Sequence, residues 1–168
     1  MHKQKIIIIV VVVILSYLFI PAPTLVNDNY CTLSNGITIQ TTTRMLCICE
    51  NNRVIQSYRV SLGRNGLGKM HEGDKKTPIG LYELSAPRKS RKFGIFIPIK
   101  YPTQQQIIDG FTGKDVGIHG PFKLFGWATF FNAWFNWTQG CIAVGDNKEL
   151  VSIAKWVNEH PNTNILIN

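Results

Sequence analysis

The chain has few charged side chains, and acidic ones are especially scarce. Charged residues make up 17% of the 168 residues, whereas hydrophobic residues make up 45%. This balance excludes a disordered, self-repelling polymer. The 18 basic against 10 acidic residues give a formal net charge of +8. The charge excludes an acidic partner-mimic and leaves polyanions, anionic lipid surfaces or cell-wall polymers as possible partners.

Other patterns are also missing. The sequence has no internal repeat, no low-complexity tract outside its N-terminal segment, and no motif that reads nucleic acid. Metal-binding spacing is absent, because Cys47 and Cys49 are only two residues apart and no histidine lies near them. We therefore expect no metal, no other cofactor and no nucleic-acid partner.

The N-terminal segment is typical of an export signal. A basic head of five residues precedes the apolar run Ile6–Ile20, and uncharged sequence continues to Asn27. These 22 residues are long enough to span a bilayer core of roughly 30 Å. A cut after Ala22 would leave Pro23 directly downstream, which favours an uncleaved anchor over a cleaved signal peptide. Residues 1–27 thus predict a domain outside the cytosol, anchored in the envelope membrane, or secreted if the signal is cleaved.

Three cysteines precede the middle of the exported part. Cys47 and Cys49 lie two apart in a strand-like stretch and are expected as small buried hydrophobic side chains. The oxidising compartment permits a disulfide from Cys31 to either of them, and both pairings stay open.

The rest of the chain is predicted as one mostly-β domain. Residues 28–36 form a short spacer, and residues 37–168 form the domain, with Asn51-Asn52 as a hairpin turn. One clear helix spans Asn147–Glu159 behind the N-cap Asp146, with Leu150, Val151, Ile153, Ala154 and Val157 on its apolar stripe. Gln104–Ile108 is a short second helix. The expected strands are Ile37–Thr42, Arg44–Glu50, Arg53–Ser61, Gly80–Leu84, Gly94–Ile99, Val116–His119, Cys141–Val144 and Asn164–Ile167.

Two segments carry candidate chemistry. Gly117–Gly120 ends a strand with His119, and Thr138–Val144 places Cys141 at the start of an apolar strand. A cysteine nucleophile needs a nearby imidazole to activate it and backbone N–H groups to hold the oxyanion. Gly140 lets the backbone pass close to a substrate carbonyl. A core histidine and a buried thiol would be the ordinary explanation if the flanking residues were different.

The flanking residues resemble the L,D-transpeptidase catalytic domain of the YkuD type, in the branch whose site reads W-T-x-G-C-I-A-V. Three blocks occur in order across about residues 37–145. They are Ser61–Gly63 with Gly73–Tyr82, then Ile118–Gly120, then Asn136–Val144. The resemblance implies a mainly β (α+β) fold, namely a single L,D-transpeptidase-like β-sandwich with one C-terminal helix and the site in a cleft at strand ends.

The resemblance also implies a mechanism. Cys141 would attack the carbonyl of the third residue of a peptidoglycan stem peptide and release D-alanine, and His119 would activate the thiol. The carbonyl of Gly120 would orient the imidazole. Oxyanion donors would be the N–H of Cys141 and that of Gly140 or Gln139, beside Thr138. The thioester then passes to an acceptor amine. We expect Cys141 and His119 within hydrogen-bond reach.

Two positions depart from the family pattern. Gln139 stands where many members carry histidine, and Ala143 stands where many carry Arg or Asn. A substrate carboxylate would then need another cation, for which Arg64 and Lys69 are the candidates.

Two further groups of side chains have open interpretations. The cluster Arg88–Lys92 is expected as a solvated loop that could also meet anionic polymers. An aromatic run between the histidine and the cysteine could form a rim over the site, face a membrane interface or enter the core. Its members are Phe122, Phe125, Trp127, Phe130, Phe131, Trp134, Phe135 and Trp137.

Two alternatives accompany the acyltransferase. One is a cysteine hydrolase that cuts a stem-peptide bond or a bond between the wall and an attached protein. The other is an inactive, anchored wall-binding domain, which the residues Gln139 and Ala143 suggest. Expected partners are peptidoglycan stem peptides, the membrane through the N-terminal segment and a wall-attached protein, with the chain as a monomer.

Overall fold

A computed structural model describes residues 28–121 and 132–168. Within these two ranges no helix is long and apolar enough to cross a membrane. The expected anchor, residues 1–27, lies outside the described residues.

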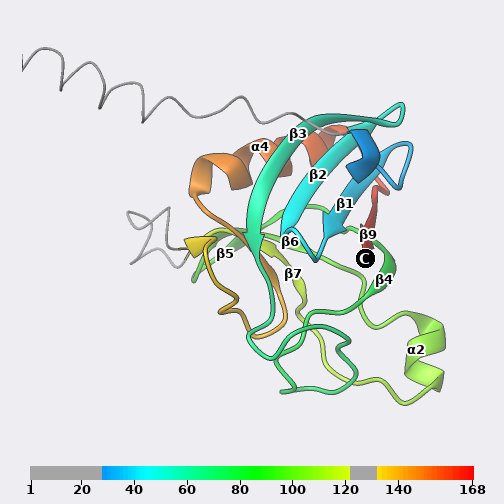
Figure 1. Cartoon of the computed structure of the whole chain (residues 1–168). Coiled ribbons are helices and arrows are strands. Elements are labelled where there is room, and N and C mark those ends of the chain that lie inside the picture. The colour runs from blue at the N-terminus through cyan, green and yellow to red at the C-terminus, as the bar shows by residue number, and fades with distance from the viewer. Residues whose placement is uncertain (1–27, 122–131) are drawn as a thin grey trace, which may run out of the picture.

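The described residues form nine strands in one mixed sheet (Figure 1). Its order is β4-β9-β1-β2-β3-β8-β7-β6-β5. The pairs β1–β9 and β7–β8 are parallel, and the other neighbours are antiparallel. The strands are β1 (Gly36–Gln40), β2 (Met45–Glu50), β3 (Arg53–Ser61), β4 (Gly80–Glu83), β5 (Arg88–Ser90), β6 (Gly94–Pro98), β7 (Gly117–His119), β8 (Ile142–Val144) and β9 (Asn164–Ile167).

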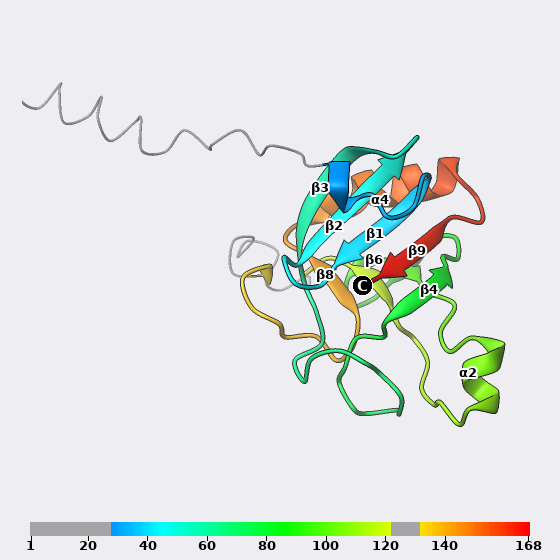
Figure 2. The ribbon, with the colours of Figure 1, turned by 45° about the vertical axis from the view of Figure 1, so that its right-hand side comes forward.

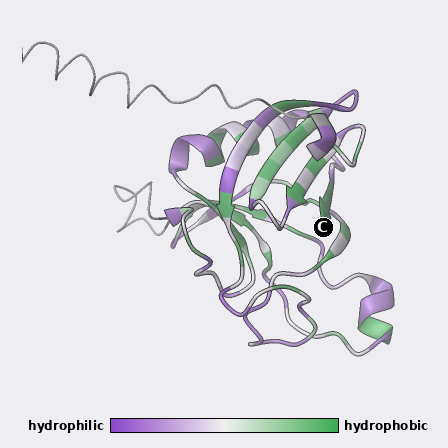
Figure 3. Ribbon diagram, viewed as in Figure 1, coloured by the Kyte–Doolittle hydropathy of each residue, from purple (hydrophilic) through white to green (hydrophobic). Residues whose placement is uncertain are grey.

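Strand β3 joins the two halves of the sheet. Most of its length pairs with β2, whereas its last two residues, Val60 and Ser61, pair with Val144 and Ala143 of β8. The sheet therefore bends at β3, and its two halves have different orientations, as the two views of the ribbon show (Figure 2). Alternating apolar residues of both halves fill the core between them (Figure 3). The predicted fold class is confirmed.

Helix α4 (Asn147–Glu159) covers this core beside β6 and β8. Its predicted N-cap is confirmed, because the Asp146 carboxylate accepts from the N–H groups of Lys148 and Glu149. The predicted stripe is wrong at one position. Val151 is 55% exposed, and Trp156 is buried, where its Nε1 donates to Glu50 Oε1 at 2.6 Å.

The predicted short helix and hairpin turn are both present in the structure. The short helix α2 (Gln104–Ile108) is confirmed, and Asn51 and Asn52 both take positive φ in the hairpin turn. Arg44 also has a positive φ of 54°, so it ends the β1–β2 turn and is not the first residue of β2. Residues Arg88–Ser90, expected in a solvated loop, instead form β5 against β6.

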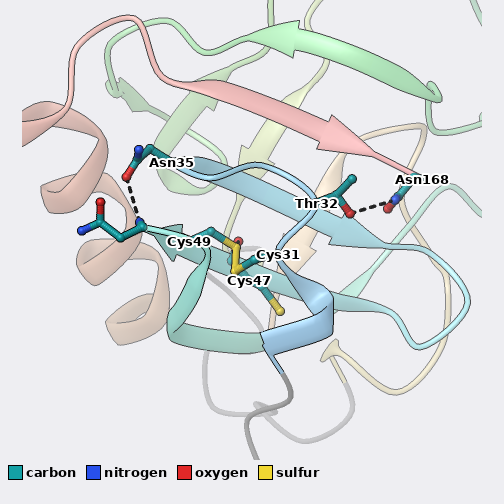
Figure 4. The surroundings of a disulfide bond; sticks show 7 residues. Cys31, Thr32, Asn35, Cys47, Cys49 and Asn168 are labelled. Carbon is teal, nitrogen blue, oxygen red and sulfur yellow. Dashed lines mark hydrogen bonds between the residues drawn. A yellow bond between two sulfur atoms is a disulfide. The ribbon is translucent and has the colours of Figure 1, made fainter.

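The stretch expected as a spacer is attached to the sheet (Figure 4). The 3-10 helix η1 (Asp28–Tyr30) precedes Cys31, which forms a disulfide with Cys49 of β2. Asn51 N–H donates to Asn35 Oδ1 at 3.1 Å, so the following residues are held as well. The pairing that the sequence left open is therefore Cys31–Cys49, and Cys47 is a free, buried thiol as expected.

Replacing Cys31 by serine is expected to lower the free energy of unfolding. The disulfide closes a loop with a sequence separation of 18, which corresponds to about 3 kcal/mol of lost unfolded-state entropy. Urea unfolding under oxidising conditions measures the difference. Dithiothreitol should destabilise the unsubstituted protein to the same level and leave Cys31→Ser unchanged. An equal response of Cys31→Ser to dithiothreitol would contradict the assignment.

Candidate active site

The candidate nucleophile and base lie on two neighbouring strands. Strands β7 and β8 are parallel, with Ile118 opposite Ile142 and His119 opposite Ala143. Cys141 directly precedes β8, and residues two apart in a strand share a face. Cys141 and His119 are thus diagonal neighbours on one face of the sheet.

The sequence blocks that lie far apart in the chain meet behind this turn. Gly63 forms a bridge with Thr138, and its N–H donates to the buried Thr77 Oγ1 at 2.8 Å. Gly140 has a φ of +120°, and a Cβ there would lie 2.6 Å from the carbonyl oxygen of Lys76. Glycine is therefore required at this position both by the backbone conformation and by the close approach of the T-P-x-G segment.

Thr138 fixes the turn that carries the cysteine. Its buried hydroxyl donates to the carbonyl of Cys141 at 2.7 Å and accepts from the N–H of Gly140 at 3.1 Å. The Gly140 N–H is thereby engaged within the turn. Of the donors predicted for the oxyanion, this leaves the N–H groups of Cys141 and Gln139.

His119 is held as a neutral base. It is 2% exposed, and its Nδ1 lies 2.6 Å from the carbonyl oxygen of Gly120. Because a carbonyl only accepts, Nδ1 carries the proton and Nε2 keeps a lone pair. Burial lowers the pKa of His119 to about 4, and the hydrogen bond to Gly120 offsets part of that effect. The Gly120 carbonyl thus lies where it can orient the imidazole, as the sequence predicted.

Two aromatic rings hold the imidazole plane. Phe93 stacks on His119 with ring centroids 3.7 Å apart, and Trp137 meets it edge-on at 5.7 Å. Trp137 belongs to the predicted aromatic run and is half-buried, which fits the rim interpretation. Trp134 and Phe135 are exposed, at 55% and 58%. The other members, Phe122, Phe125, Trp127, Phe130 and Phe131, lie outside the described residues.

The surroundings of Cys141 favour its protonated thiol. Burial raises its pKa to about 11, although the backbone N–H of Gly117 acts in the opposite direction. Its Sγ lies 3.5 Å from the carbonyl oxygen of Asp115. The expected thiol–imidazole hydrogen bond is therefore replaced by a contact with Asp115, because the thiol is turned toward that carbonyl. The two pKa shifts favour a neutral thiol and a neutral imidazole, and both residues line one cavity.

Both side chains open into one cavity of about 620 Å³. Arg64 lies on one wall, and the hairpin of β5 and β6 supplies Arg88, Lys92 and Phe93 on the other. Arg88 lies over the ring of Phe96, 4.9 Å from its centroid, and 3.4 Å from Asp115 Oδ1. The cavity is thus cationic, which suits a ligand with carboxylate groups.

The two cations predicted from the sequence have different places. Arg64 lines the cavity. Lys69 is only 5% exposed, and its Nζ binds Asp74 Oδ1 and the carbonyl of His71, both at 2.9 Å. This pairing inside the loop argues against Lys69 as the partner of a substrate carboxylate and favours Arg64.

Asp74 is the centre of that loop. Burial acts to raise the pKa of its carboxyl group, but hydrogen bonds from the N–H groups of Lys76, His71 and Met70 and from the Lys69 ammonium hold it well below the usual range. The hydrogen bonds around Asp74 fix the loop of the G-D-x-x-T-P block, and this loop packs against the turn that carries Cys141 through the contact between Lys76 and Gly140. His71 contributes its backbone to this network.

Sequence reasoning missed Arg88, Lys92 and Phe93 as cavity residues. Strand β5 has only three residues and no hydrophobic alternation, so its pattern resembles a charged loop.

The described residues around the cavity contain no metal-binding arrangement. Within residues 28–121 and 132–168, no group of three or more His, Cys, Asp or Glu side chains is placed to hold a metal ion.

The buried neutral imidazole makes the stability depend on pH. The unfolded chain takes up a proton at His119 near pH 6.5, whereas the folded protein resists it until about pH 4. Stability is therefore complete above pH 6.5 and is lost as the pH falls, by about 3 kcal/mol at pH 4. Urea unfolding at pH 7 and pH 4 measures this loss. It should be smaller by that amount in His119→Gln, and an equal loss in both proteins would contradict the assignment.

Comparison with known families agrees with this geometry. Residues 34–167 match the model of the YkuD family, the L,D-transpeptidase catalytic domain. The chain belongs to this family. The match covers both catalytic candidates and all three sequence blocks, so the resemblance of the motifs extends over the whole folded domain. No curated protein matches the chain.

Solved structures share the fold of this L,D-transpeptidase domain. The helical cell shape determining protein Pgp2 from Campylobacter jejuni has 24% identity and a TM-score of 0.64, over 79% of this chain and 46% of that chain. Bdellovibrio bacteriovorus Bd1075 has 21% identity and a TM-score of 0.56, over 79% and 47%. An L,D-transpeptidase from Mycobacterium smegmatis has 11% identity and a TM-score of 0.50, over 79% and 57%. The chain spans about half the length of the first two proteins.

Proposed function

We propose that this chain is an exported cysteine acyltransferase that acts on peptidoglycan stem peptides. The observation that carries the proposal is the placement of a buried, neutral His119, fixed by the Gly120 carbonyl, beside the Cys141 turn in one cavity. Membership of the L,D-transpeptidase family supports the same chemistry. A domain that only binds the wall has no need of a thiol–imidazole pair in this arrangement.

The reaction begins with general-base catalysis. His119 Nε2 takes the proton of the Cys141 thiol while Sγ leaves the Asp115 carbonyl and attacks the carbonyl carbon of stem residue 3. The tetrahedral oxyanion accepts hydrogen bonds from the N–H groups of Cys141 and Gln139, because the Gly140 N–H is bound to Thr138. In this scheme the thiol loses its proton as Sγ attacks, because the lowered pKa of His119 and the raised pKa of Cys141 disfavour a thiolate–imidazolium pair before attack.

Collapse of the intermediate breaks the peptide bond. The amine of D-alanine leaves with the proton that His119 Nε2 had taken, and the acyl group stays on Cys141 as a thioester. An acceptor amine then attacks the thioester and gives up a proton to His119, which returns it to the departing sulfur. Transfer to the amine makes a cross-link or attaches a protein, whereas transfer to water makes the enzyme a hydrolase.

Substrate carboxylates would bind the cationic walls of the cavity. Substituting Arg88 or Lys92 by alanine is expected to raise KM about 10-fold with a small change in kcat, because a charge-assisted contact is lost in both the bound and transition states. Steady-state release of D-alanine measures both constants. Lys89→Ala is the matched control, since Lys89 is exposed on the same strand without lining the cavity. An unchanged KM in all three variants would contradict this role.

The experiment for the function is product analysis with the full-length chain in detergent. Purified tetrapeptide muropeptides are incubated with the protein, and free D-alanine and muropeptide dimers are quantified. Dimers together with D-alanine would establish transpeptidation. D-alanine without dimers would establish a hydrolase, which intact sacculi would test further. The absence of any product from both substrates would favour the wall-binding alternative and refute the enzyme.

The cellular setting follows from the sequence and from one relative. We propose that residues 1–27 anchor the domain on the outer side of the cytoplasmic membrane. Pgp2 is described as a helical cell shape determining protein. A contribution of this chain to cell shape is a corresponding proposal, which microscopy of a strain lacking it would test.

A further inference from the structure

The chain is attached to the sheet soon after its apolar N-terminal run. The run ends at Ile20, uncharged sequence ends at Asn27, and Cys31 is covalently bound to Cys49 of β2. The three residues before Cys31 form η1, which packs against β3. A run anchored in a membrane would therefore hold the domain near the bilayer surface, because only residues 21–27 stand between the run and η1.

The surface next to this attachment belongs to β3. On β2, Leu46 and Ile48 enter the core, so the alternate residues point to the outer side. Cys47 pairs with Ser57 and Met45 with Arg59, which places Ser57 and Arg59 on the same outer side. A register shift between Ile48 and Cys49 reverses the alternation beyond this point, so Arg53, opposite Glu50, lies on the side of α4. The other side of β3 faces α4, because Gln56 accepts a hydrogen bond from Ser152 at 3.1 Å.

The exposed residues of this outer side are basic and apolar. Arg59 is exposed on this side, and Ile55, the extra residue at the register shift, is 44% exposed. Arg44 is adjacent, because Met45 pairs with Arg59. The stretch 53–61 contains no acidic residue. Such a combination attracts anionic headgroups by charge and lets an aliphatic side chain enter the interface.

Two aromatic residues extend this surface at the end of β3. The Arg44 guanidinium donates to the carbonyl of Trp134 at 2.7 Å, and Ser61 Oγ lies 2.6 Å from the carbonyl of Phe135. The backbone that carries both exposed rings is thereby fixed to the sheet. Exposed tryptophan and phenylalanine on a rigid backbone, beside arginine, suit the headgroup region of a bilayer.

We propose that this β3 face rests on the anionic surface of the membrane in which the chain is anchored. The β3 face consists of Arg44, Ile55, Arg59, Trp134 and Phe135. The inference rests on the anchoring proposed above and adds the orientation of the domain. A domain of this length has a radius of gyration of about 14 Å, so the cavity lies within roughly 40 Å of the bilayer. The enzyme then acts on stem peptides close to the membrane.

The test uses the full-length chain in vesicles of phosphatidylcholine with 30 mol% phosphatidylglycerol, and in vesicles of phosphatidylcholine alone. Lipids brominated near the headgroup end of the acyl chain quench tryptophan emission by contact. The difference between the unsubstituted protein and Trp134→Leu gives the signal of Trp134. We expect this signal to be quenched by at least half in the anionic vesicles and less in the neutral ones.

The charge requirement is tested with a matched pair of variants. Arg59→Glu reverses a charge on the β3 face and should remove most of the quenching. Lys155→Glu makes the same change in net charge at an exposed position of α4, across the core, and should leave the quenching intact. An unquenched Trp134, or an equal effect of the two variants, would overturn the inference.

Carbonate extraction of the same vesicles distinguishes a failure of the proposed membrane anchor from a failure of the proposed orientation. If the chain stays with the lipid while Trp134 remains unquenched, the anchor holds and the orientation is wrong. If carbonate releases the chain, both the anchor and the orientation are overturned. Acyl transfer on soluble muropeptides, measured on the same samples, is independent of either result.

Discussion

Replacing Cys141 by serine is expected to lower kcat by roughly 10⁴-fold or more with little change in KM. The substitution keeps the size of the side chain and its position in the cavity. A serine hydroxyl is a much weaker acid than the thiol, and the pKa of His119, lowered by burial to about 4, makes the imidazole too weak a base to activate it. Release of D-alanine from tetrapeptide muropeptides measures the loss.

The second free cysteine provides the control. Cys47 is buried in β2 on the outer side of the sheet, and burial raises the pKa of its thiol to about 11, as it does for Cys141. Cys47→Ala should therefore keep its activity despite some loss of stability. Substantial activity in Cys141→Ser, or complete loss in a folded Cys47→Ala protein, would show that the nucleophile has been assigned wrongly.

Replacing His119 by glutamine is expected to lower kcat/KM by roughly 10³-fold. Glutamine keeps a polar group beside Phe93 and Trp137 but cannot take the thiol proton. The pH profile distinguishes this loss from a packing defect. The unsubstituted enzyme should lose activity on acidification with an apparent pKa near 4, because protonated His119 cannot act as a base.

The residual activity of His119→Gln should have no such acid limb. Its activity should instead rise toward the pKa of the thiol, which burial places at about 11 in the resting protein. An acid limb that persists unchanged in the variant would assign the titration to another group, and the general-base role would fall.

The parts of the fold that were predicted correctly depend on local chemistry. Asp146 caps α4 with its own carboxylate, and Asn51-Asn52 adopt positive φ without help from distant residues. The candidate catalytic segments were singled out because the residues flanking His119 and Cys141 resemble the L,D-transpeptidase motif, and the structure places both residues along one cavity. Gly140 meets this requirement in the structure through its φ of +120° and its contact with Lys76.

The parts that could not be predicted depend on pairings across the sheet. Lys69 was predicted as a substrate-binding cation because the sequence does not reveal that its ammonium forms an ion pair with Asp74. Phe93 follows a charged stretch, and only the pairing of β5 with β6 brings it onto His119. Likewise Cys47 and Cys49 share one side of β2, and only the position of residues 31–35 beside the end of the strand decides that Cys49 pairs with Cys31.

The central claim is that an acyl group is carried by Cys141. Intact-protein mass spectrometry after rapid acid quench of the full-length chain with tetrapeptide muropeptide tests it most directly. We predict a mass increase equal to the mass of the substrate minus D-alanine, which peptide mapping locates on Cys141. Hydroxylamine should remove this adduct because it cleaves thioesters. The Cys141→Ser protein should form no thioester adduct. D-alanine release from the unsubstituted protein without any adduct on Cys141, under conditions that trap the intermediate, would contradict the account.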